Sequence, residues 1–518
     1  MVYFCFFSHL HQSSRMNIIK ALTLTPLLLF PAPSTAQIPL ASPYTSTFNS
    51  TFSLSPSQIQ ATNLSADIAS SVETTINFER SQLAHGGPLE DDFYTLPPLR
   101  NTSALKPGTL LKVQDITSPT HFAIPPNTAL SRILYTTTNI NGSVIPTSGF
   151  LLWPFVPRNV HRADKGEKGN GSVSIPVVVW THGTSGFFAP QATSSHRALW
   201  YGHSAPFTLA LAGYAVFAPD YAGLGVGRSW DGSEIPHQYH ATPAAARDAL
   251  FGLRAAREAF DGKVRLDGKW IVMGHSQGGA VAWGVAEALA ASPGRFGDLE
   301  KGYGGAIAVS PTTDMFGSPF VLTYMLATVG FSLRSIFSDF DIGMWLKPLG
   351  VKRAGFIREV QGGIGVVSQL MLREDETSLV RQEDWNRTWH AEAFGGIGNA
   401  GGRDFRGPLL VIQGTEDFLV PYDGTARAVN ETASRFPGRD LEFLVLKGVG
   451  HTPVLDASRQ FWLEWIRERM GDEPVGHEGF KRIEVESVWP VERYLHVANS
   501  VTLWVGLPEF EHLAELRL

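Results

Sequence analysis

The sequence is nearly free of cysteine. Cys5 is the only cysteine among 518 residues, so no disulfide can form within the chain. Hydrophobic residues make up 43% and charged residues 17% of the sequence, which is the composition of a globular protein and not of a disordered one. We therefore expect a large hydrophobic core to provide the stability that many exported proteins obtain from disulfides.

A basic excess and cofactor motifs are also missing. The formal net charge is -6, so the chain offers little attraction to phosphate backbones, and we do not expect nucleic acid as a partner. Gly223, Gly225 and Gly227 are spaced as G-x-G-x-G. This spacing fits neither the P-loop nor the dinucleotide-binding pattern, and we interpret it as a structural loop. No group of His, Cys and Asp has metal-ligand spacing, so the sequence predicts neither a metal ion nor a cofactor.

The apolar run near the N-terminus is short. Residues 21–30 are apolar, follow a short basic segment, and precede small residues at 34–36, which is the pattern of a secretory signal peptide. We predict that translation starts at Met16, that residues 1–36 form the signal region, and that the protein is secreted into the extracellular medium. The alternative is that residues 1–15 extend the run into a membrane anchor.

Seven N-x-S/T sequons without an intervening proline agree with export, because such segments accept glycans in secreted proteins. None of them lies in a segment that we expect to be a buried strand. We therefore predict that most lie at the surface. The candidate glycosylation sites are Asn49, Asn63, Asn101, Asn141, Asn170, Asn386 and Asn430.

Regular strand signals begin after a proline-rich segment. Residues 37–110 show no long hydrophobic period, and we interpret them as an arm lying on a larger domain. Residues 131–138 and 148–153 are predicted to form a hairpin through the turn Asn141-Gly142. Short, fully apolar runs follow, which are typical of parallel strands buried on both faces. These runs cover residues 177–180, 214–219, 270–273, 306–309, 409–412 and 443–446.

Helical segments separate several of the predicted strands. One begins at Thr242, one covers residues 278–292, and one covers residues 455–470. This alternation predicts an α/β fold with a mostly parallel central sheet and helices on both faces. Residues 311–406 are too many for one crossover and predict an inserted, largely helical cap, with a second domain that has no role in the site as the alternative. The predicted parts are the signal region 1–36, the arm 37–110, the core 111–310 and 407–470, the cap 311–406, and a C-terminal extension 471–518.

The stretch GHSQG at residues 274–278 has the G-x-S-x-G pattern, in which a serine nucleophile stands on a sharp turn between a strand and a helix. The pattern alone is weak in a chain with 51 glycines, but here it joins a predicted buried strand to an Ala-rich helix. Gly274 and Gly278 would lie where strand and helix come too close for a side chain. We predict that Ser276 is the nucleophile and that His275 has a packing role.

A serine hydroxyl needs a general base, and the base needs an orienting carboxylate. Asp417 and His451 each follow a later predicted strand, so we expect both at the same sheet edge as Ser276. Asp417 is preferred to Glu416 because neighbouring residues of a strand point in opposite directions and Asp417 lies nearer the loop. The chain order Ser, Asp, His is that of the α/β-hydrolase fold.

Two backbone N–H groups are expected to form the oxyanion hole. Gln277 follows the nucleophile, and Thr184 follows an earlier predicted strand, so we predict that their amides bind the developing oxyanion. Gly183 and Ser185 are alternatives for the second donor. We interpret His182 as a residue that braces this loop.

The chain resembles secretory lipases of fungi and actinobacteria, which have the α/β-hydrolase fold. The resemblance rests on WTHGTSG, FAPDYAGLG, GHSQGG, QGTEDFLVP and GVGHTPVL, and it extends over about residues 91–470. It implies a secreted ester hydrolase with a lid-like cap over an acyl pocket. It also implies nucleophile, acid and base roles for Ser276, Asp417 and His451.

The predicted function is hydrolysis of carboxylic esters, as a lipase or carboxylesterase, through an acyl-serine intermediate. The expected substrate is a small-molecule or lipid ester, with transient contact to a lipid interface. A secreted serine peptidase and an acyltransferase use the same triad and are alternatives, whereas a non-catalytic binding module would usually lack one triad member. We expect the cap to line an acyl pocket, since such pockets are mostly apolar. The predicted pocket residues are Phe320, Tyr324, Met325 and Phe331.

Overall fold

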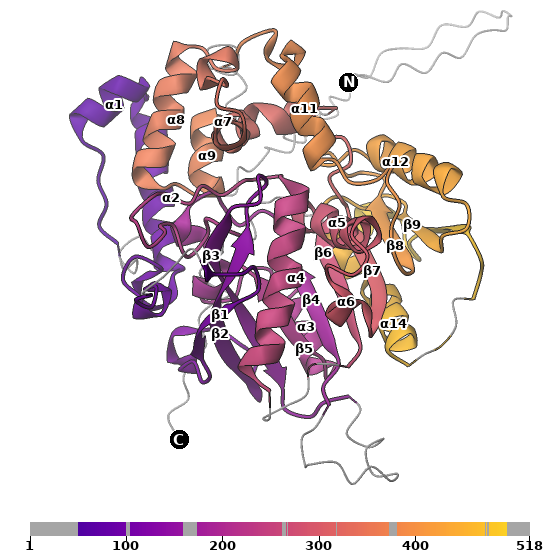
Figure 1. Ribbon diagram of the computed structural model, residues 1–518. Coiled ribbons are helices and arrows are strands. Elements are labelled where there is room, and N and C mark those ends of the chain that lie inside the picture. Colours follow the sequence, from indigo (N-terminus) through magenta and orange to yellow (C-terminus); the bar gives the residue numbers. More distant parts are fainter. Residues whose placement is uncertain are drawn as a thin grey trace, which may run out of the picture. The chain divides into compact units, whose positions relative to one another are not determined.

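One ten-stranded sheet organises the computed structural model, with the strand order β1-β2-β3-β5-β4-β6-β7-β8-β9-β10. The structure describes residues 50–494 except for 100–103, 159–173, 262–265, 267, 318, 372–380, 472 and 474–475. Three neighbouring pairs are antiparallel, namely β1 with β2, β2 with β3, and β3 with β5. All other neighbouring pairs in the sheet are parallel (Figure 1). The strands are β1 (Leu110–Gln114), β2 (Thr128–Thr138), β3 (Val144–Pro154), β4 (Val177–Thr181), β5 (Ala215–Pro219), β6 (Trp270–His275), β7 (Tyr303–Val309), β8 (Leu409–Gly414), β9 (Leu441–Leu446) and β10 (Phe480–Val485).

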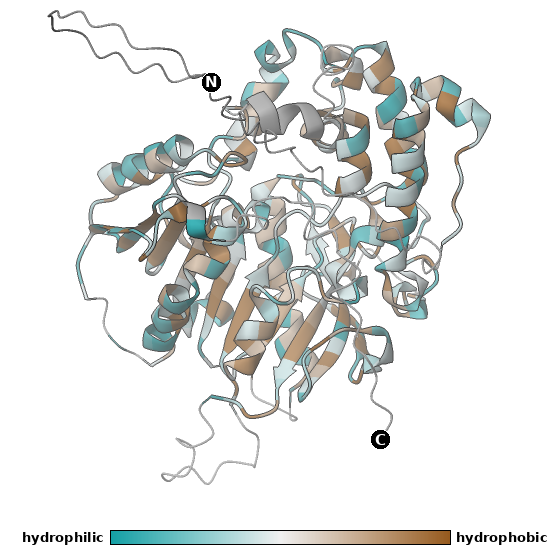
Figure 2. Cartoon of the chain, turned by 180° about the vertical axis from the view of Figure 1, so that it is seen from behind, coloured by the Kyte–Doolittle hydropathy of each residue, from teal (hydrophilic) through white to brown (hydrophobic). Residues whose placement is uncertain are grey.

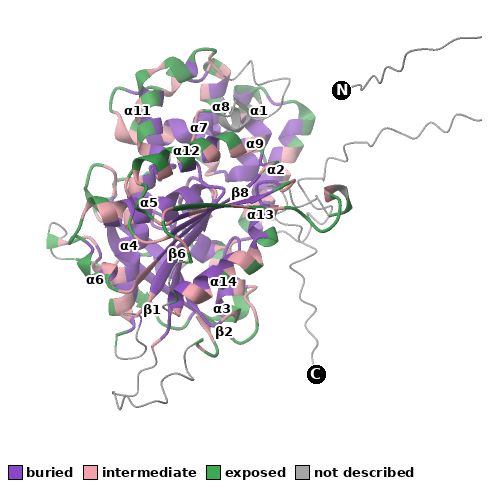
Figure 3. Cartoon of the chain, turned by 90° about the vertical axis from the view of Figure 1, so that its right-hand side faces the viewer, coloured by how far each residue is buried: buried purple, intermediate pink, exposed green. Residues whose placement is uncertain are grey.

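Helices cover both faces of the sheet, as the alternation of side chains along each strand requires. In β6, Trp270 and Val272 belong to the core that contains α4, α5 and α12, whereas Ile271 and Met273 belong to the core that contains α3, α13 and α14. The central strand β6 is therefore fully buried and packed on both faces (Figures 2 and 3). These helices are α3 (Pro206–Leu211), α4 (Thr242–Ala259), α5 (Gln277–Ala291), α12 (Tyr422–Arg435), α13 (Pro453–Ala457) and α14 (Arg459–Met470).

A helical cap fills the connection between β7 and β8. It consists of α7 (Pro319–Ile336), α8 (Pro348–Val360), α9 (Ile364–Met371) and α11 (Trp389–Gly398), which lie together beyond one end of the sheet (Figure 1). The α/β-hydrolase fold with an inserted helical cap, predicted from the sequence, is confirmed. Among the described helices, none is long and apolar enough to cross a membrane.

The N-terminal segment adds two helices to this layer, and the sequence analysis had predicted neither. Helix α1 (Pro56–Thr62) packs on α8, and α2 (Ala66–Ser81) packs on α9. Glu79 of α2 accepts hydrogen bonds from the amides of Gly363 (2.8 Å) and Gly365 (2.9 Å) at the start of α9. A carboxylate at this helix terminus satisfies amides that have no partner within the helix.

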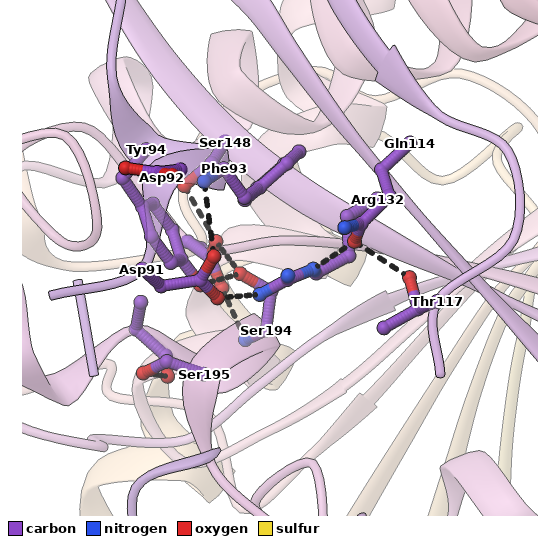
Figure 4. A network of polar contacts seen from close by, with 12 residues as sticks. Asp91, Asp92, Phe93, Tyr94, Gln114, Thr117, Arg132, Ser148, Ser194 and Ser195 are labelled. Atoms are coloured by element: carbon purple, nitrogen blue, oxygen red, sulfur yellow. Dashed lines mark hydrogen bonds and ion pairs between the residues drawn. The ribbon is translucent and has the colours of Figure 1, made fainter. Parts of the chain in front are cut away.

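A buried ion pair ties the following loop to the sheet (Figure 4). Arg132 of β2 donates from Nη1 to Asp91 Oδ2 at 2.7 Å and from Nε to Gln114 Oε1 at 2.7 Å. The Arg132 side chain is fully buried and that of Asp91 is 9% exposed. Removing one partner of such a pair leaves an uncompensated buried charge, which typically costs ~3–5 kcal/mol.

Every strand predicted from the sequence overlaps a strand of the structure, but the end of the chain differs. The single helix expected at 455–470 is two helices, α13 and α14, separated at Ser458. Strand β10, which pairs in parallel with β9, was not predicted.

Candidate active site

Ser276 stands at the junction of β6 and α5 with strained backbone angles, φ 59° and ψ -122°. A Cβ at Gly278 would lie 1.9 Å from the Thr181 carbonyl oxygen, and one at Gly274 would lie 2.1 Å from the Gly278 carbonyl oxygen. The sequence-based expectation that only glycine fits at these two positions is therefore confirmed. The Ser276 side chain is half-buried, and its hydroxyl makes no hydrogen bond to a residue that the structure describes, so it remains available to a substrate.

Asp417 and His451 are joined directly, at the carboxyl ends of β8 and β9. His451 Nδ1 lies 2.8 Å from Asp417 Oδ2, and both side chains are buried. Because a carboxylate only accepts hydrogen bonds, Nδ1 carries the proton, and Nε2 is left as the basic nitrogen. Glu416, the neighbouring acid, is exposed and donates its backbone amide to Val449.

Asp417 is held in place by four donors. Its Oδ1 accepts from the amides of Leu419 (3.0 Å) and Val420 (2.8 Å), and its Oδ2 accepts from Gln413 Nε2 (3.0 Å) in addition to His451. Burial raises the pKa of Asp417, but the neighbouring His451 and the hydrogen bonds to the carboxylate outweigh burial, so the pKa lies below its ordinary value. The carboxylate is therefore ionised near neutral pH and able to stabilise a protonated His451.

His275 connects the elbow to the backbone of His451. Its Nε2 donates to the His451 carbonyl oxygen at 2.8 Å, so its Nδ1 accepts from the Tyr201 hydroxyl, also at 2.8 Å. Burial lowers the pKa of His275 to about 3, which keeps the ring neutral in this arrangement. The sequence analysis assigned His275 only a packing role and did not identify Tyr201, because no local motif surrounds that tyrosine.

The two predicted oxyanion donors lie on different elements, Thr184 on the loop after β4 and Gln277 at the start of α5. No described residue accepts a hydrogen bond from the Thr184 amide, and its Oγ1 lies 2.8 Å from the Tyr239 hydroxyl. Gln277 is the first residue of α5, so its amide has no partner within the helix. Both amides are thus available to a developing oxyanion. Gly183 and Ser185 are equally without an amide partner among the described residues.

His182 is buried under the loop after β4 and makes contacts that hold it in place. Its Nδ1 lies 2.8 Å from the Gly183 carbonyl oxygen, and its ring stacks on Tyr221 with centroids 4.2 Å apart. Tyr221 in turn donates to the His182 carbonyl oxygen at 3.0 Å. Burial lowers the pKa of His182, so the ring is a neutral part of the loop.

The four predicted pocket residues are only partly described. The side chains of Phe320 and Tyr324 lie outside the described residues. Met325 is buried, with its sulfur 3.9 Å from the Tyr239 hydroxyl. Phe331 of α7 faces Phe188 of the loop after β4, with ring centroids 6.0 Å apart, and both line a cavity of about 900 Å³.

The predicted glycosylation sites are also only partly within the described residues. Four sequon asparagines are exposed: Asn63, Asn141, Asn386 and Asn430. The other three lie outside the described residues: Asn49, Asn101 and Asn170. Within the described ranges, no three metal-ligating side chains lie close enough together to hold an ion.

Known proteins show similarity at the level of family and fold. Residues 178–462 match the Alpha/beta hydrolase family. The structure of Candida antarctica lipase A is similar, with a TM-score of 0.58 and 15% sequence identity, over 81% of this chain and 94% of that chain. The structure of the same lipase in its closed state has a TM-score of 0.55 and 17% sequence identity, over 76% of this chain and 88% of that chain. The rice cell wall degrading esterase LipA from Xanthomonas oryzae has a TM-score of 0.53 and 18% identity over 71% of this chain and 100% of its own. No curated protein matches the sequence.

Proposed function

The chain belongs to the alpha/beta hydrolase family, and we propose that it is a secreted serine hydrolase that cleaves carboxylic esters through an acyl-serine intermediate. The observation that carries the proposal is the 2.8 Å contact between Asp417 and His451. The His451 backbone is hydrogen-bonded to His275, which directly precedes the half-buried Ser276 on its strained strand-to-helix turn. A buried, ionised carboxylate that orients a histidine is the arrangement that activates a serine hydroxyl.

In the first half of the reaction, Ser276 Oγ attacks the ester carbonyl carbon, and its proton passes to His451 Nε2. The charge that develops on the carbonyl oxygen is stabilised by the amides of Gln277 and Thr184, and the charge on the imidazolium by Asp417. The C–O bond to the alcohol then breaks, and the alcohol takes the proton from His451. An acyl group remains on Ser276.

Water completes the cycle. His451 Nε2 removes a proton from a water molecule, whose oxygen attacks the acyl carbon through a second oxyanion held by the same amides. Breakage of the bond to Ser276 Oγ releases the acid and returns the proton to the serine. The two kinds of structural neighbour, a lipase and an esterase, favour an ester over an amide as the substrate.

Substitution of the nucleophile tests this proposal. Ser276→Ala is expected to abolish covalent labelling by a fluorophosphonate and to reduce kcat by about 10⁴-fold or more, because triad members act as a unit. Ser292→Ala, a half-buried serine at the other end of α5, is the matched control and should keep both properties. Labelling that persists in Ser276→Ala would refute the proposal.

A substrate panel separates the ester hydrolase from the peptidase and acyltransferase alternatives. We expect hydrolysis of p-nitrophenyl esters within the range from acetyl to palmitoyl and no cleavage of peptide anilides. Cleavage of anilides alone would favour a peptidase, and transfer to an added alcohol in preference to water would favour an acyltransferase.

Export is tested on the protein recovered from culture medium. We expect its N-terminus near Gln37, and we expect glycosidase treatment to lower its mass because four sequon asparagines are exposed. Recovery of a chain that still begins at Met1 or Met16 would contradict removal of residues 1–36.

A further inference from the structure

A cavity of about 900 Å³ lies beside the proposed oxyanion hole, and the chemistry described above leaves its role open. Its walls come from separate parts of the chain: Phe187 and Phe188 of the loop after β4, the glycine loop at 223–227, His237, and Phe331 of the cap. The volume is that of a site for a small organic ligand, typically about 300–1,000 Å³.

Two contacts connect this cavity to the proposed oxyanion donors. His237 donates from Nδ1 to the Ala222 carbonyl oxygen at 3.0 Å, and its Nε2 faces the side-chain amide of Gln277 at 3.5 Å. Phe187 packs edge-on against Tyr239 with ring centroids 5.0 Å apart, and Tyr239 bonds to Thr184. A ligand in the cavity is therefore separated from Gln277 by one side chain, His237, and from Thr184 by two, Phe187 and Tyr239.

The cavity is lined by both aromatic and charged side chains. Three exposed arginines line it, Arg228, Arg334 and Arg358, together with a single acid, Glu234. Arg358 forms an ion pair with Glu234, so the positive charge of Arg228 and Arg334 is not balanced by an acid of the lining. Arg334 has no hydrogen-bond or ion-pair partner among the residues that the structure describes. This local excess of positive charge occurs on a protein with a formal net charge of -6.

We propose that this cavity selects esters that carry a negatively charged group, with Arg334 as the residue that binds the anion. The inference rests on the proposed function, because it names the substrate class of the same site. Aromatic walls bury the hydrocarbon part of the ester, and a guanidinium offers a planar pair of donors that matches a carboxylate or phosphate. Arg334 is carried by α7 of the cap, which also supplies Phe331, so one helix contributes both the apolar and the cationic contact.

Matched substrates test the charge preference. We compare p-nitrophenyl valerate with the mono-p-nitrophenyl ester of glutaric acid, which places a carboxylate at the end of an acyl chain of the same length. A second pair, phenyl butyrate and 4-carboxyphenyl butyrate, places the charge on the alcohol side and identifies which half of the ester occupies the cavity. In at least one pair, we expect kcat/KM to be about 10-fold higher for the anionic ester, mainly through a lower KM, and to lose this advantage at high salt.

Variants then assign the preference to one residue. Arg334→Gln is expected to reduce the anionic-to-neutral ratio of kcat/KM about 10-fold. Lys352→Gln removes an exposed positive charge from α8, outside the cavity, and should leave the ratio unchanged. Thermal melting of both variants establishes that they are folded.

The outcomes separate this inference from the proposed function. Hydrolysis of the neutral esters without a preference in either pair would overturn the inference and leave the esterase intact. An equal loss of preference in Arg334→Gln and Lys352→Gln would also overturn it, because the effect would then be one of overall charge. Failure to hydrolyse any ester, with no labelling of Ser276, would overturn the proposed function itself.

Discussion

Replacing Tyr201 by phenylalanine removes one hydroxyl group that lies two hydrogen bonds from His451. The hydroxyl donates to His275 Nδ1 at 2.8 Å, and His275 Nε2 donates to the His451 carbonyl oxygen at 2.8 Å. Without the tyrosine, the buried Nδ1 keeps its lone pair but loses its donor. Moving the ring proton to Nδ1 gives no relief, because Nδ1 would then be a donor without an acceptor and Nε2 would face the His451 carbonyl oxygen without a proton.

The free-energy cost of Tyr201→Phe follows from the burial of the hydrogen-bonded groups of Tyr201, His275 and His451. A buried polar atom left without its partner costs ~1–3 kcal/mol, and we expect Tyr201→Phe to lower the free energy of unfolding by that amount. The hydroxyl also packs against Gly183, where a Cβ would lie 2.3 Å from it, so its loss loosens the loop of the proposed oxyanion hole. A shift of about 1 Å in catalytic groups can cost on the order of 100-fold in rate, and we expect kcat to fall 10- to 100-fold.

Tyr214 supplies the matched control. It is buried in the same core, but its hydroxyl has no hydrogen-bond partner within the described part of the chain. Urea unfolding and steady-state kinetics on p-nitrophenyl butyrate, measured well below the melting temperature, should show a large effect for Tyr201→Phe and a small one for Tyr214→Phe. Equal effects of the two substitutions would refute the reasoning.

Three further predictions concern the acid, the pH dependence of stability, and the cap. Asp417→Asn should reduce kcat about 10³- to 10⁴-fold by favouring the wrong histidine tautomer, whereas Glu416→Gln should keep most of the activity. The reverse ranking of the two variants in steady-state kinetics would assign the acid role to Glu416 instead. Burial raises the pKa of Asp248 from 3.8 to about 7, so its favourable contribution to folding is complete below about pH 4 and is lost as the pH rises through 7. The difference is on the order of 4 kcal/mol, and Asp248→Asn should melt with a correspondingly weaker pH dependence than the parent, whereas parallel melting curves would contradict the assignment. Tryptophan at Phe331 or Met325 should shift the preferred ester to shorter acyl chains while acetyl esters are still hydrolysed, and an unchanged chain-length profile in both variants would show that these residues do not limit the pocket.

The core of the fold could be predicted because its signals are local. A strand buried on both faces must be apolar at every position, and β4, β6 and β8 are therefore visible as continuous apolar runs. The elbow is equally visible as a short motif, although Gly278 is required by the Thr181 carbonyl oxygen of β4 and only Gly274 by a backbone contact within the turn. The positions of Asp417 and His451 followed from these strands, because parallel strands bring their carboxyl ends to one edge.

The parts that escaped prediction depend on partners far away in the sequence. Helix α2 is rich in Ser and Thr, and its docking depends on Glu79, which meets the start of α9 at Gly363, 284 positions later. Strand β10 has the sequence FKRIEV, with exposed charges, and is held in the sheet by its parallel pairing with β9, from which it is separated by α13 and α14 in the chain. In α2, Ile68, Val72 and Ile76 do form an apolar stripe at helical spacing, but the sequence analysis missed it because Ser and Thr surround it.

The sequence analysis predicted a strained backbone only at the elbow, but several other residues near the carboxyl ends of the strands are strained as well. Ser276 and Ser310 directly follow β6 and β7, Tyr221 lies two residues after β5, and all three have positive φ without being glycine. Residues Leu199–Tyr201 add three consecutive left-handed residues, which place the Tyr201 hydroxyl on His275. Each such residue costs ~1–3 kcal/mol and persists only where the surrounding structure fixes it.

The hydrogen bonds that join Tyr201, His275 and His451 supply that constraint, so the same bonds that hold the strained turn also hold the proposed base. Loss of any one bond should therefore weaken both stability and catalysis.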